Sequence, residues 1–528
     1  MPSKKIQVAL PLLLSVVMIA GMFIGYQLRS KTGNAPLLAS GNRSSLPELI
    51  RLVREKYVDE VAADSIDQLV STELLSHLDP HSVWMSATDL QDAEDEMNES
   101  FQGIGIEFQL LRDSVQVMFV LPAAPAAKAG IQTGDILISV NDTLLLSGQK
   151  LSPAGVRKAL RGQPTPDLRL TILRNGKRIA TKLTKGIVPL PAVDAAFLLQ
   201  PGTGYIHMNK FANRTYEEFM QQMEKLKTKG MKQLVLDLRG NGGGLMKEAI
   251  DIADEFLSDD KLIVYTEGKH VPKTIYKASR YGIFEEGGLV VLIDETSASA
   301  SEVLAGALQD WDRATIIGRR SFGKGLVQQQ FNLTSGNAVR LTTARYFTPL
   351  GRNIQRPYLD KENTDQQPGP HPLMKNIRGE QDTIQQQGKV YTTPGGKKLY
   401  GGGGIQPTII VAWDTTALTP IIFELLYKNT LNRYVYDLYL QGRSQFDTMT
   451  SATNVAAYLQ PGAGFRSAVQ AAAAADDIDL KSITPAQEIF LLHRCRMLLA
   501  RQRFHQQGFY EVAATYDPAI KTALQVLK

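Results

Sequence analysis

A cluster of small hydroxyl residues near the middle of the chain could supply a nucleophile. Three serines lie from Ser297 to Ser301, directly after the apolar stretch Leu289–Ile293 and before a helical pattern that runs through Trp311. A serine at such a strand-to-helix turn is exposed. The free N–H groups and the dipole of the helix can stabilise the oxyanion that forms when its hydroxyl attacks a carbonyl. Helix capping is the alternative role for the same hydroxyls.

A lysine between two glycines is the candidate base for that serine. Lys324 lies in Phe-Gly-Lys-Gly, residues 322–325, and no histidine lies in either neighbouring strand-helix unit. Lysine acts as a base only when it is neutral, so burial must lower its pKa from about 10.4 toward 7–8, at a cost of roughly 4 kcal/mol. An ordinary surface lysine in a glycine turn is the alternative for this segment taken alone.

A glycine-rich loop could bind an anion. Asp237–Gly244 reads Asp-Leu-Arg-Gly-Asn-Gly-Gly-Gly, follows the apolar stretch Leu234–Leu238 and precedes a helical pattern over 245–257. Its free amides suit an oxyanion, although a tight turn or a phosphate nest would have the same pattern. The seven histidines form no closely spaced ligand pair, and the sequence lacks a G-x-S-x-G elbow, a P-loop and a G-x-G-x-x-G fingerprint. We therefore expect no metal site and no cofactor.

Two kinds of pattern must position these residues. Short strands with turns occupy about 101–185 and include the hairpin signal Asn175-Gly176. After about residue 189, apolar strands alternate with amphipathic helices, which is typical of α/β architecture.

Helical patterns flank both parts. Capping-box patterns at Ser45 and Ser65 predict a helical lead-in, and another at Thr484 predicts a helix through about Gln506.

The N-terminal segment and the composition limit the expected location, partners and kinds of site. Lys4 and Lys5 precede an uncharged, mostly apolar stretch over 6–28, which is longer than a secretory signal core and favours an uncleaved signal anchor. A net charge of +5 on 528 residues is too small to indicate nucleic acid. The single cysteine, Cys495, excludes an intramolecular disulfide and a cysteine-based zinc cluster.

The order of the motifs resembles that of the carboxyl-terminal processing (tail-specific) serine proteases. In that family a PDZ-like segment precedes motifs that match residues 237–244, 297–302, 322–325 and 346–352 here. Asp79-Pro80-His81-Ser82 also resembles the family's N-terminal region. The resemblance covers roughly residues 46–414, and the tail beyond 414 matches nothing in the family.

The resemblance implies a role for five residues. The family's nucleophile lies 25 residues before the catalytic lysine, which selects Ser299 as the partner of Lys324. Gln328 matches the residue that orients the lysine amine. The backbone N–H groups of Gly243 and Ala300 match the oxyanion donors.

A second site is implied in the strand-rich part. The segment 101–106 resembles the carboxylate-binding loop of PDZ domains, in which backbone amides bind a peptide's terminal carboxylate while the peptide adds as a strand to a sheet edge. Residues 129–141 fit the signature of the same domain, and a small β-sandwich without a ligand is the alternative. The predicted carboxylate-binding residues are Gln102, Gly103, Ile104, Gly105 and Ile106.

The expected architecture is α/β and multidomain. An N-terminal membrane helix and a helical lead-in precede a PDZ-like β domain, an α/β protease core of the crotonase/Clp-like type, and a helical C-terminal extension. The predicted boundaries are 1–30 for the signal anchor, 31–97 for the linker and N-terminal helices, 98–188 for the PDZ domain, 189–414 for the core and 415–528 for the extension.

We expect a serine endopeptidase that recognises protein C-termini through its PDZ domain and cleaves near them. Its partners would be protein substrates with free C-termini, the membrane, and an adaptor or a second copy of the chain, but no nucleic acid. The expected location is the bacterial inner membrane, with one span and the catalytic part outside the cytoplasm. A non-catalytic PDZ scaffold on a degenerate protease body, and an acyl-CoA enzyme, are the alternatives.

Overall fold

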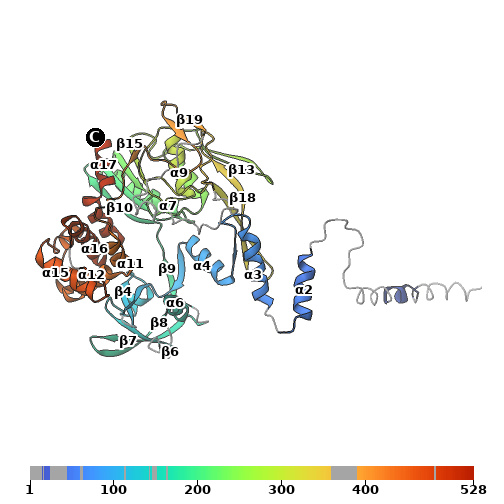
Figure 1. Cartoon of the computed structure of the whole chain (residues 1–528), viewed down its shortest axis with the longest axis horizontal. Coiled ribbons are helices and arrows are strands. Elements are labelled where there is room, and N and C mark those ends of the chain that lie inside the picture. Colours follow the sequence, from blue (N-terminus) through green and yellow to red (C-terminus); the bar gives the residue numbers. More distant parts are fainter. Residues whose placement is uncertain are drawn as a thin grey trace, which may run out of the picture. The chain divides into compact units, whose positions relative to one another are not determined.

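The computed structural model (Figure 1) forms two compact units, residues 1–74 and 75–528. It describes residues 15, 17–23, 45–59, 63–111, 114–141, 143–144, 152–161, 165–357, 389–414, 416–480 and 483–528.

The first unit contains helical residues at 17–23, helix α2 (Leu46–Lys56) and most of α3 (Ala63–Ser76). Most of the predicted signal anchor lies outside the described residues. Across the ranges that are described, no helix combines the length and the apolar character needed to span a bilayer.

The predictions of capping boxes at Ser45 and Ser65 were wrong. Ser45 has helical dihedral angles and its side chain caps nothing, while α3 begins before Ser65. The box at Thr484 is confirmed, because its side chain and that of Gln487 each accept a hydrogen bond from the other's backbone N–H.

After the end of α3, the second unit contains a strand that the helical interpretation of residues 31–97 missed. Strand β1 pairs with β18 in a sheet of the order β1-β18-β13-β14, to which β17 adds beside β18. Helix α4 then leads into the PDZ part. The bounds are β1 Val83–Met85, α4 Ala87–Met97, β13 Leu262–Gly268, β14 Val271–Lys277, β17 Leu326–Asn332 and β18 Ala338–Phe347.

The PDZ part is a sheet of the order β3-β4-β5-β7-β8, in which β3 is an edge strand. The predicted hairpin at Asn175-Gly176 is confirmed, because both residues have positive φ and join β7 to β8. The bounds are β2 Ser100–Gly103, β3 Ile106–Leu111, β4 Ser114–Val120, α5 Pro125–Lys128, β5 Ile136–Val140, β6 Thr143–Leu144, α6 Pro153–Arg161, β7 Asp167–Arg174, β8 Lys177–Thr184 and β9 Gly186–Pro189.

The protease part is built on a sheet of the order β10-β11-β12-β15-β16-β21, in which the strands from β11 onward are parallel. Side chains alternate between its two faces. One face packs on α7, α8 and α9, and the other packs on α17 from the end of the chain. The bounds are β10 Val193–Gln200, β11 Thr203–Met208, α7 Thr215–Thr228, β12 Gln233–Asp237, α8 Met246–Asp254, β15 Gly288–Ile293, α9 Ala300–Asp310, β16 Thr315–Gly318, β19 Val390–Thr392, β20 Lys398–Tyr400 and β21 Ile409–Ile410.

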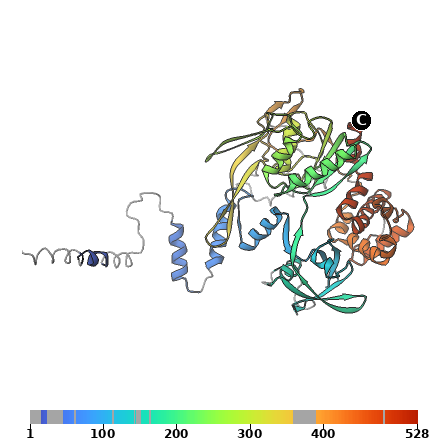
Figure 2. The ribbon, with the colours of Figure 1, turned by 180° about the vertical axis from the view of Figure 1, so that it is seen from behind.

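The predicted helical extension is confirmed as a bundle of helices, which both views show (Figures 1 and 2). The bundle has its own apolar core. Helix α16 bends at His505, whose φ of 58° and ψ of −152° are not helical. The bounds are α11 Pro420–Tyr427, α12 Thr430–Gln441, α13 Arg443–Phe446, α14 Ala452–Ala456, α15 Ala463–Ala474, α16 Pro485–Tyr516 and α17 Pro518–Val526.

Candidate active site

Three neighbouring parallel strands bring the predicted residues of the core together. The glycine-rich loop follows β12, the serine cluster follows β15, and the lysine loop follows β16, and these strands are adjacent in the order β12-β15-β16. The carboxyl ends of parallel strands meet at one edge of a sheet, which is where open α/β folds bind ligands. Topology therefore unites segments that are up to 87 residues apart, from Asp237 to Lys324.

Ser299 differs from the other two serines of its cluster. It is partly exposed at the start of α9, and its φ of 53° lies in the left-handed region that favours glycine. Ser297 and Ser301 are fully buried, and their hydroxyls donate to the backbone oxygens of Leu238 (2.8 Å) and Asn241 (2.9 Å). These two serines join the nucleophile loop to the glycine-rich loop, so Ser299 is the serine of this cluster that the solvent reaches.

Lys324 lies in a half-buried position where its amine donates to Oε1 of Gln328 at 2.8 Å. Burial lowers the pKa of this amine below the ordinary value of a lysine, and the charge of Arg340 acts in the same direction. The charges of Asp79 and Glu302 oppose the shift. The amine thus has the lowered basicity that a general base needs.

Two buried side chains hold Ser299 and Lys324 next to each other. Oε2 of Glu302 accepts from the N–H of Ser299 and from the N–H of Lys324, both at 2.9 Å. The hydroxyl of Tyr346 lies 3.1 Å from the carbonyl oxygen of Ser299 and 2.6 Å from that of Lys324. Burial raises the pKa of the Glu302 carboxyl, while its hydrogen bonds with Ser321, Lys324, Gly323 and Ser299 oppose that shift. The sequence reasoning assigned no role to Glu302 or Tyr346.

The two predicted oxyanion donors lie close together, but their N–H groups differ in the hydrogen bonds that they form. A Cβ placed on Gly243 would lie 2.8 Å from Cβ of Ser299 and 3.0 Å from N of Ala300, so only glycine fits there. The Gly243 N–H donates to Oδ1 of Asn241 at 2.9 Å. Within the described residues, the Ala300 N–H at the first turn of α9 forms no hydrogen bond.

The glycine-rich loop is anchored by charges that the sequence reasoning did not use. Asp237 is fully buried and pairs with Arg239, and Nη1 of Arg239 also donates to Oδ2 of Asp517 at 2.7 Å. Asp517 lies 278 residues further along the chain, at the start of α17. No short-range signal could have revealed this contact.

The far end of the Gln328 side chain is also held. Its Nε2 donates to the backbone oxygen of His81, in the Asp-Pro-His-Ser motif that resembles the family's N-terminal region. Burial and the charge of Lys324 lower the pKa of the His81 imidazole, and Asp79 opposes them.

The predicted carboxylate-binding segment lies at the end of an apolar groove. A cavity of about 760 Å³ lies along the edge strand β3 and helix α6, and four of the five predicted residues line it. Gln102 lies on β2 and does not. Gly105 has a φ of 76°, and a Cβ there would lie 2.3 Å from Cβ of Ala124, so the loop requires glycine. The four lining residues are Gly103, Ile104, Gly105 and Ile106.

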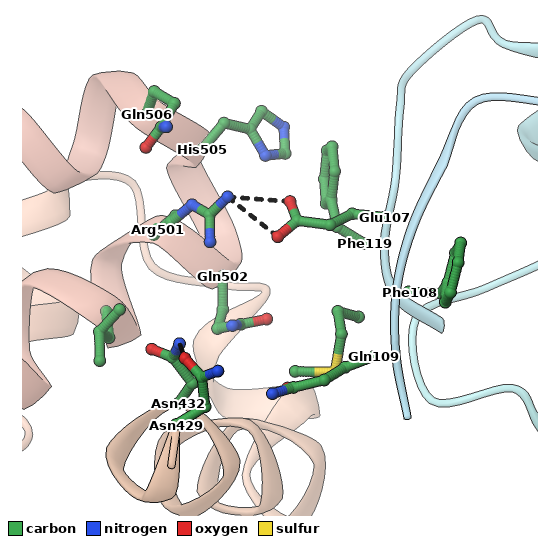
Figure 3. A pocket seen from close by; sticks show the side chains of 12 residues that line it. Glu107, Phe108, Gln109, Phe119, Asn429, Asn432, Arg501, Gln502, His505 and Gln506 are labelled. Atoms are coloured by element: carbon green, nitrogen blue, oxygen red, sulfur yellow. Dashed lines mark hydrogen bonds and ion pairs between the residues drawn. The ribbon is translucent and has the colours of Figure 1, made fainter. Parts of the chain in front are cut away.

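The C-terminal bundle contacts the same PDZ strand, and its residues His505 and Gln506 also line the groove. Figure 3 shows Glu107 and Gln109 pointing from β3 toward α16, with Phe108 pointing the opposite way. Nη2 of Arg501 donates to both carboxylate oxygens of Glu107, at 3.1 and 2.9 Å, beside a cavity of about 300 Å³. His505, at the bend of α16, packs on the ring of Phe119 at 4.2 Å.

Metal ligands do not gather anywhere in the described ranges, because no three His, Cys, Asp or Glu side chains come close enough to hold an ion. The arrangement at the sheet edge can instead supply a hydroxyl nucleophile, an amine base and backbone N–H donors. Those are the parts needed for acyl transfer.

Comparison with known proteins agrees with this chemistry. The family model described as "Peptidase family S41" matches residues 202–362, and the model described as "PDZ domain" matches residues 102–184. The carboxy-terminal-processing protease of Bartonella bacilliformis is 32% identical over 402 residues, which cover 72% of this chain and 91% of that protein. The carboxy-terminal processing protease CtpB of Bacillus subtilis is 28% identical over 66% of this chain and 75% of its own.

A solved structure titled photosystem II D1 C-terminal processing protease is 30% identical, with a TM-score of 0.35, and covers 59% of this chain and 84% of its own. The match to the Bartonella bacilliformis protein spans nearly that whole protein. The chain therefore belongs to the carboxy-terminal-processing proteases of peptidase family S41, and it is a serine-type endopeptidase that carries a PDZ domain.

Proposed function

We propose that Ser299 is the nucleophile and Lys324 the general base of a two-residue dyad. One observation carries this proposal: Glu302 and Tyr346 each bridge the backbones of Ser299 and Lys324, so the two residues are built as one unit. The neutral amine takes the hydroxyl proton as the oxygen attacks a peptide carbonyl. The same proton then passes to the leaving amine, and an acyl-enzyme remains.

Deacylation uses the same groups in reverse order. Lys324 accepts a proton from water, the resulting hydroxide attacks the ester carbon, and the proton returns to Oγ of Ser299 as the acid leaves. A neutral lysine amine has two hydrogens and one lone pair. Donation of a hydrogen to Gln328 leaves the lone pair for Ser299 or for water.

The oxyanion would be bound by backbone N–H groups. Ala300 is the donor that needs no rearrangement. Gly243 becomes a second donor only when its bond to Asn241 breaks, because an N–H cannot point at both oxygens.

The PDZ groove supports recognition of a free protein C-terminus. We propose that the terminal carboxylate binds at residues 103–106, which line the groove, and that the peptide adds beside the edge strand β3. Amidation of a substrate's C-terminus removes the charge and leaves the scissile bond intact. Each lost charge-assisted hydrogen bond contributes roughly 1.5–3 kcal/mol, so cleavage should slow by at least about tenfold. Equal cleavage of acid and amide would contradict C-terminal recognition.

The cellular location of the enzyme is also a proposal. The charge and apolar pattern of residues 1–30 supports a single-pass anchor in a bacterial inner membrane, with the catalytic part outside the cytoplasm. The boundaries at residues 98, 189 and 415, and an adaptor or a second copy as partner, belong to the same proposal. Cell fractionation and protease accessibility in spheroplasts test the location.

The central experiment is incubation of the purified chain with an unstructured protein, followed by mass spectrometry of the fragments. We expect internal cuts with wild type and none with Ser299→Ala. Absence of cutting by wild type, together with peptide binding, would favour the non-catalytic scaffold. Thioester turnover would favour the acyl-CoA enzyme.

A further inference from the structure

The Asp-Pro-His-Ser segment, residues 79–82, lies outside the matched protease model and has no place in the dyad chemistry above. We propose that its His81 carbonyl is a positioning group that fixes the amide of Gln328, so that the amide oxygen faces Lys324. This inference rests on the proposed dyad, since it concerns how the base of that dyad is held.

The contacts form an unbroken chain from the segment to the base. The carbonyl oxygen of His81 accepts from Nε2 of Gln328, and Oε1 of Gln328 accepts from the amine of Lys324 at 2.8 Å. The His81 carbonyl and the Lys324 amine therefore lie at opposite ends of one amide group.

The chemistry of an amide makes this arrangement selective. A side-chain amide has a donor end and an acceptor end, whereas a backbone carbonyl oxygen can only accept. Contact with His81 therefore places Nε2 on that side and Oε1 on the side of Lys324. The reversed amide would set oxygen against oxygen at His81. At Lys324 its NH₂ could donate only to the lone pair of the neutral amine, which is the lone pair that the base needs.

The carbonyl is itself held by a tight turn. Oδ1 of Asp79 accepts from the N–H of His81 at 2.8 Å and from the N–H of Ser82 at 2.9 Å, and Oδ2 accepts from the Ser82 hydroxyl at 2.7 Å. Such a turn is typical of aspartate and asparagine. It orients the peptide unit that carries the His81 oxygen.

The turn is locked onto the strand pair that carries the glutamine. Ser82 is buried, and its Oγ accepts from the N–H of Thr342 at 3.2 Å. Thr342 lies directly opposite Gln328 in the register of β17 and β18. The acceptor and the glutamine that it orients are therefore fixed to the same two strands.

The decisive comparison uses Asp79→Ala and Asp79→Asn in the full chain. Both variants remove the charge that Asp79 exerts on Lys324, but asparagine keeps the oxygen that accepts from His81 and Ser82. Because a displacement of about 1 Å at a catalytic group can cost about 100-fold, we expect Asp79→Ala to lower kcat by at least about tenfold. We expect Asp79→Asn to recover most of that loss, with similar KM and thermal midpoint in both variants. Equal kcat in the two variants would overturn the proposal.

A pH profile separates this effect from the charge. The charged or titratable groups around the Lys324 amine are Arg340, Asp79, Glu302 and His81. Both Asp79 variants should move the acidic limb of the kcat profile to lower pH by the same amount. Each variant removes a negative charge that stabilises the protonated amine of Lys324, so the pKa of that amine falls. Only Asp79→Ala should also lower the plateau at high pH.

Gln328→Glu provides a second test if Asp79→Ala fails to fold. The carboxylate still accepts from Lys324 but cannot donate to His81, so the plateau should fall at least about tenfold even after the acidic limb has moved to higher pH. A plateau equal to wild type would overturn the proposal. Gln329→Glu, at the exposed neighbouring position, is the matched control for added charge.

Ser299→Ala is measured beside these variants. If it is inactive while Asp79→Ala matches Asp79→Asn, the dyad stands and the positioning role fails. If Ser299→Ala cleaves like wild type, the proposed dyad fails and the positioning role with it.

Discussion

The N-terminal turn at Asp79 and the C-terminal helix start at Asp517 support the same site by different means. Both aspartates lie outside residues 202–362, which the protease family model matches. Asp79 shapes a turn whose carbonyl orients Gln328, and hence Lys324. Asp517 pairs directly with Arg239 at the glycine-rich loop and also caps α17 through the N–H groups of Ala519 and Ile520.

The difference concerns what each region controls. The N-terminal turn acts through the direction of hydrogen bonds, so its loss should appear in the chemistry of the base. The C-terminal contact acts through charge on the buried pair of Asp237 and Arg239, so its loss should appear in the stability of the oxyanion loop. Variants on the two sides should therefore have distinct signatures, which the following predictions use.

The largest effect should come from substitutions in the proposed dyad, which both regions support. Ser299→Ala and Lys324→Arg should each lower kcat by roughly 10⁴-fold or more, because removal of one member disables a unit that acts together, and a guanidinium does not deprotonate in a protein. Peptide cleavage at saturating substrate measures this loss. Ser335→Ala, on an exposed turn, is the control. An inactive Ser301→Ala beside an active Ser299→Ala would show that Ser299 is not the nucleophile.

The next prediction concerns pH. Since burial lowers the pKa of Lys324, the amine becomes neutral at lower pH than a free lysine does. Activity should rise about tenfold per pH unit below that pKa and level off above it. Arg340→Gln removes a cation that lowers this pKa, so the acidic limb should move to higher pH. Movement to lower pH would mean that Arg340 does not act on the base by its charge.

Sequence reasoning reached the parts of this site that are local. The loops around Gly243, Ser299 and Lys324 are recognisable because each follows an apolar strand and has an unusual density of glycine or serine. The supports were missed because they bring together distant positions, such as Gln328 with His81 at 247 residues and Arg239 with Asp517 at 278. The engagement of Gly243 with Asn241 was also missed, because a motif does not specify which acceptor an N–H uses.

The same distinction between local patterns and distant contacts explains which parts of the fold could be predicted. The alternation of strands and helices in the core follows from periodicity, and the C-terminal helices follow from periodicity and from the Thr484 capping box. Strand β1 was not predicted, because its three residues, Val83–Met85, are too few to establish a period. They form a strand only because they pair with β18.

A moderate effect should come from the C-terminal support. Asp517→Ala removes both the cap of α17 and the partner of Arg239, whereas Asp517→Asn keeps the cap. Caps contribute about 1 kcal/mol and a part-buried pair contributes a similar amount, so alanine should lower the stability of this region by about 2 kcal/mol and asparagine by about 1. Hydrogen exchange in residues 238–244 and in α17 measures both. Equal loss in the two variants would mean that the cap contributes nothing, and an asparagine variant as stable as wild type would mean that the ion pair contributes nothing.

The smallest effect should come from the ion pair between the C-terminal bundle and the PDZ strand (Figure 3). The Arg501 and Glu107 side chains are 32% and 47% exposed, and pairs of this kind contribute less than about 1 kcal/mol. Arg501→Glu should therefore raise the KM for a free-acid peptide by less than about threefold, and adding Glu107→Arg should restore it. A tenfold rise that the reversed pair repairs would show that this contact fixes the peptide-binding strand. The C-terminal bundle would then control substrate capture as well as the oxyanion loop, and the N-terminal turn would remain the support that acts on the base.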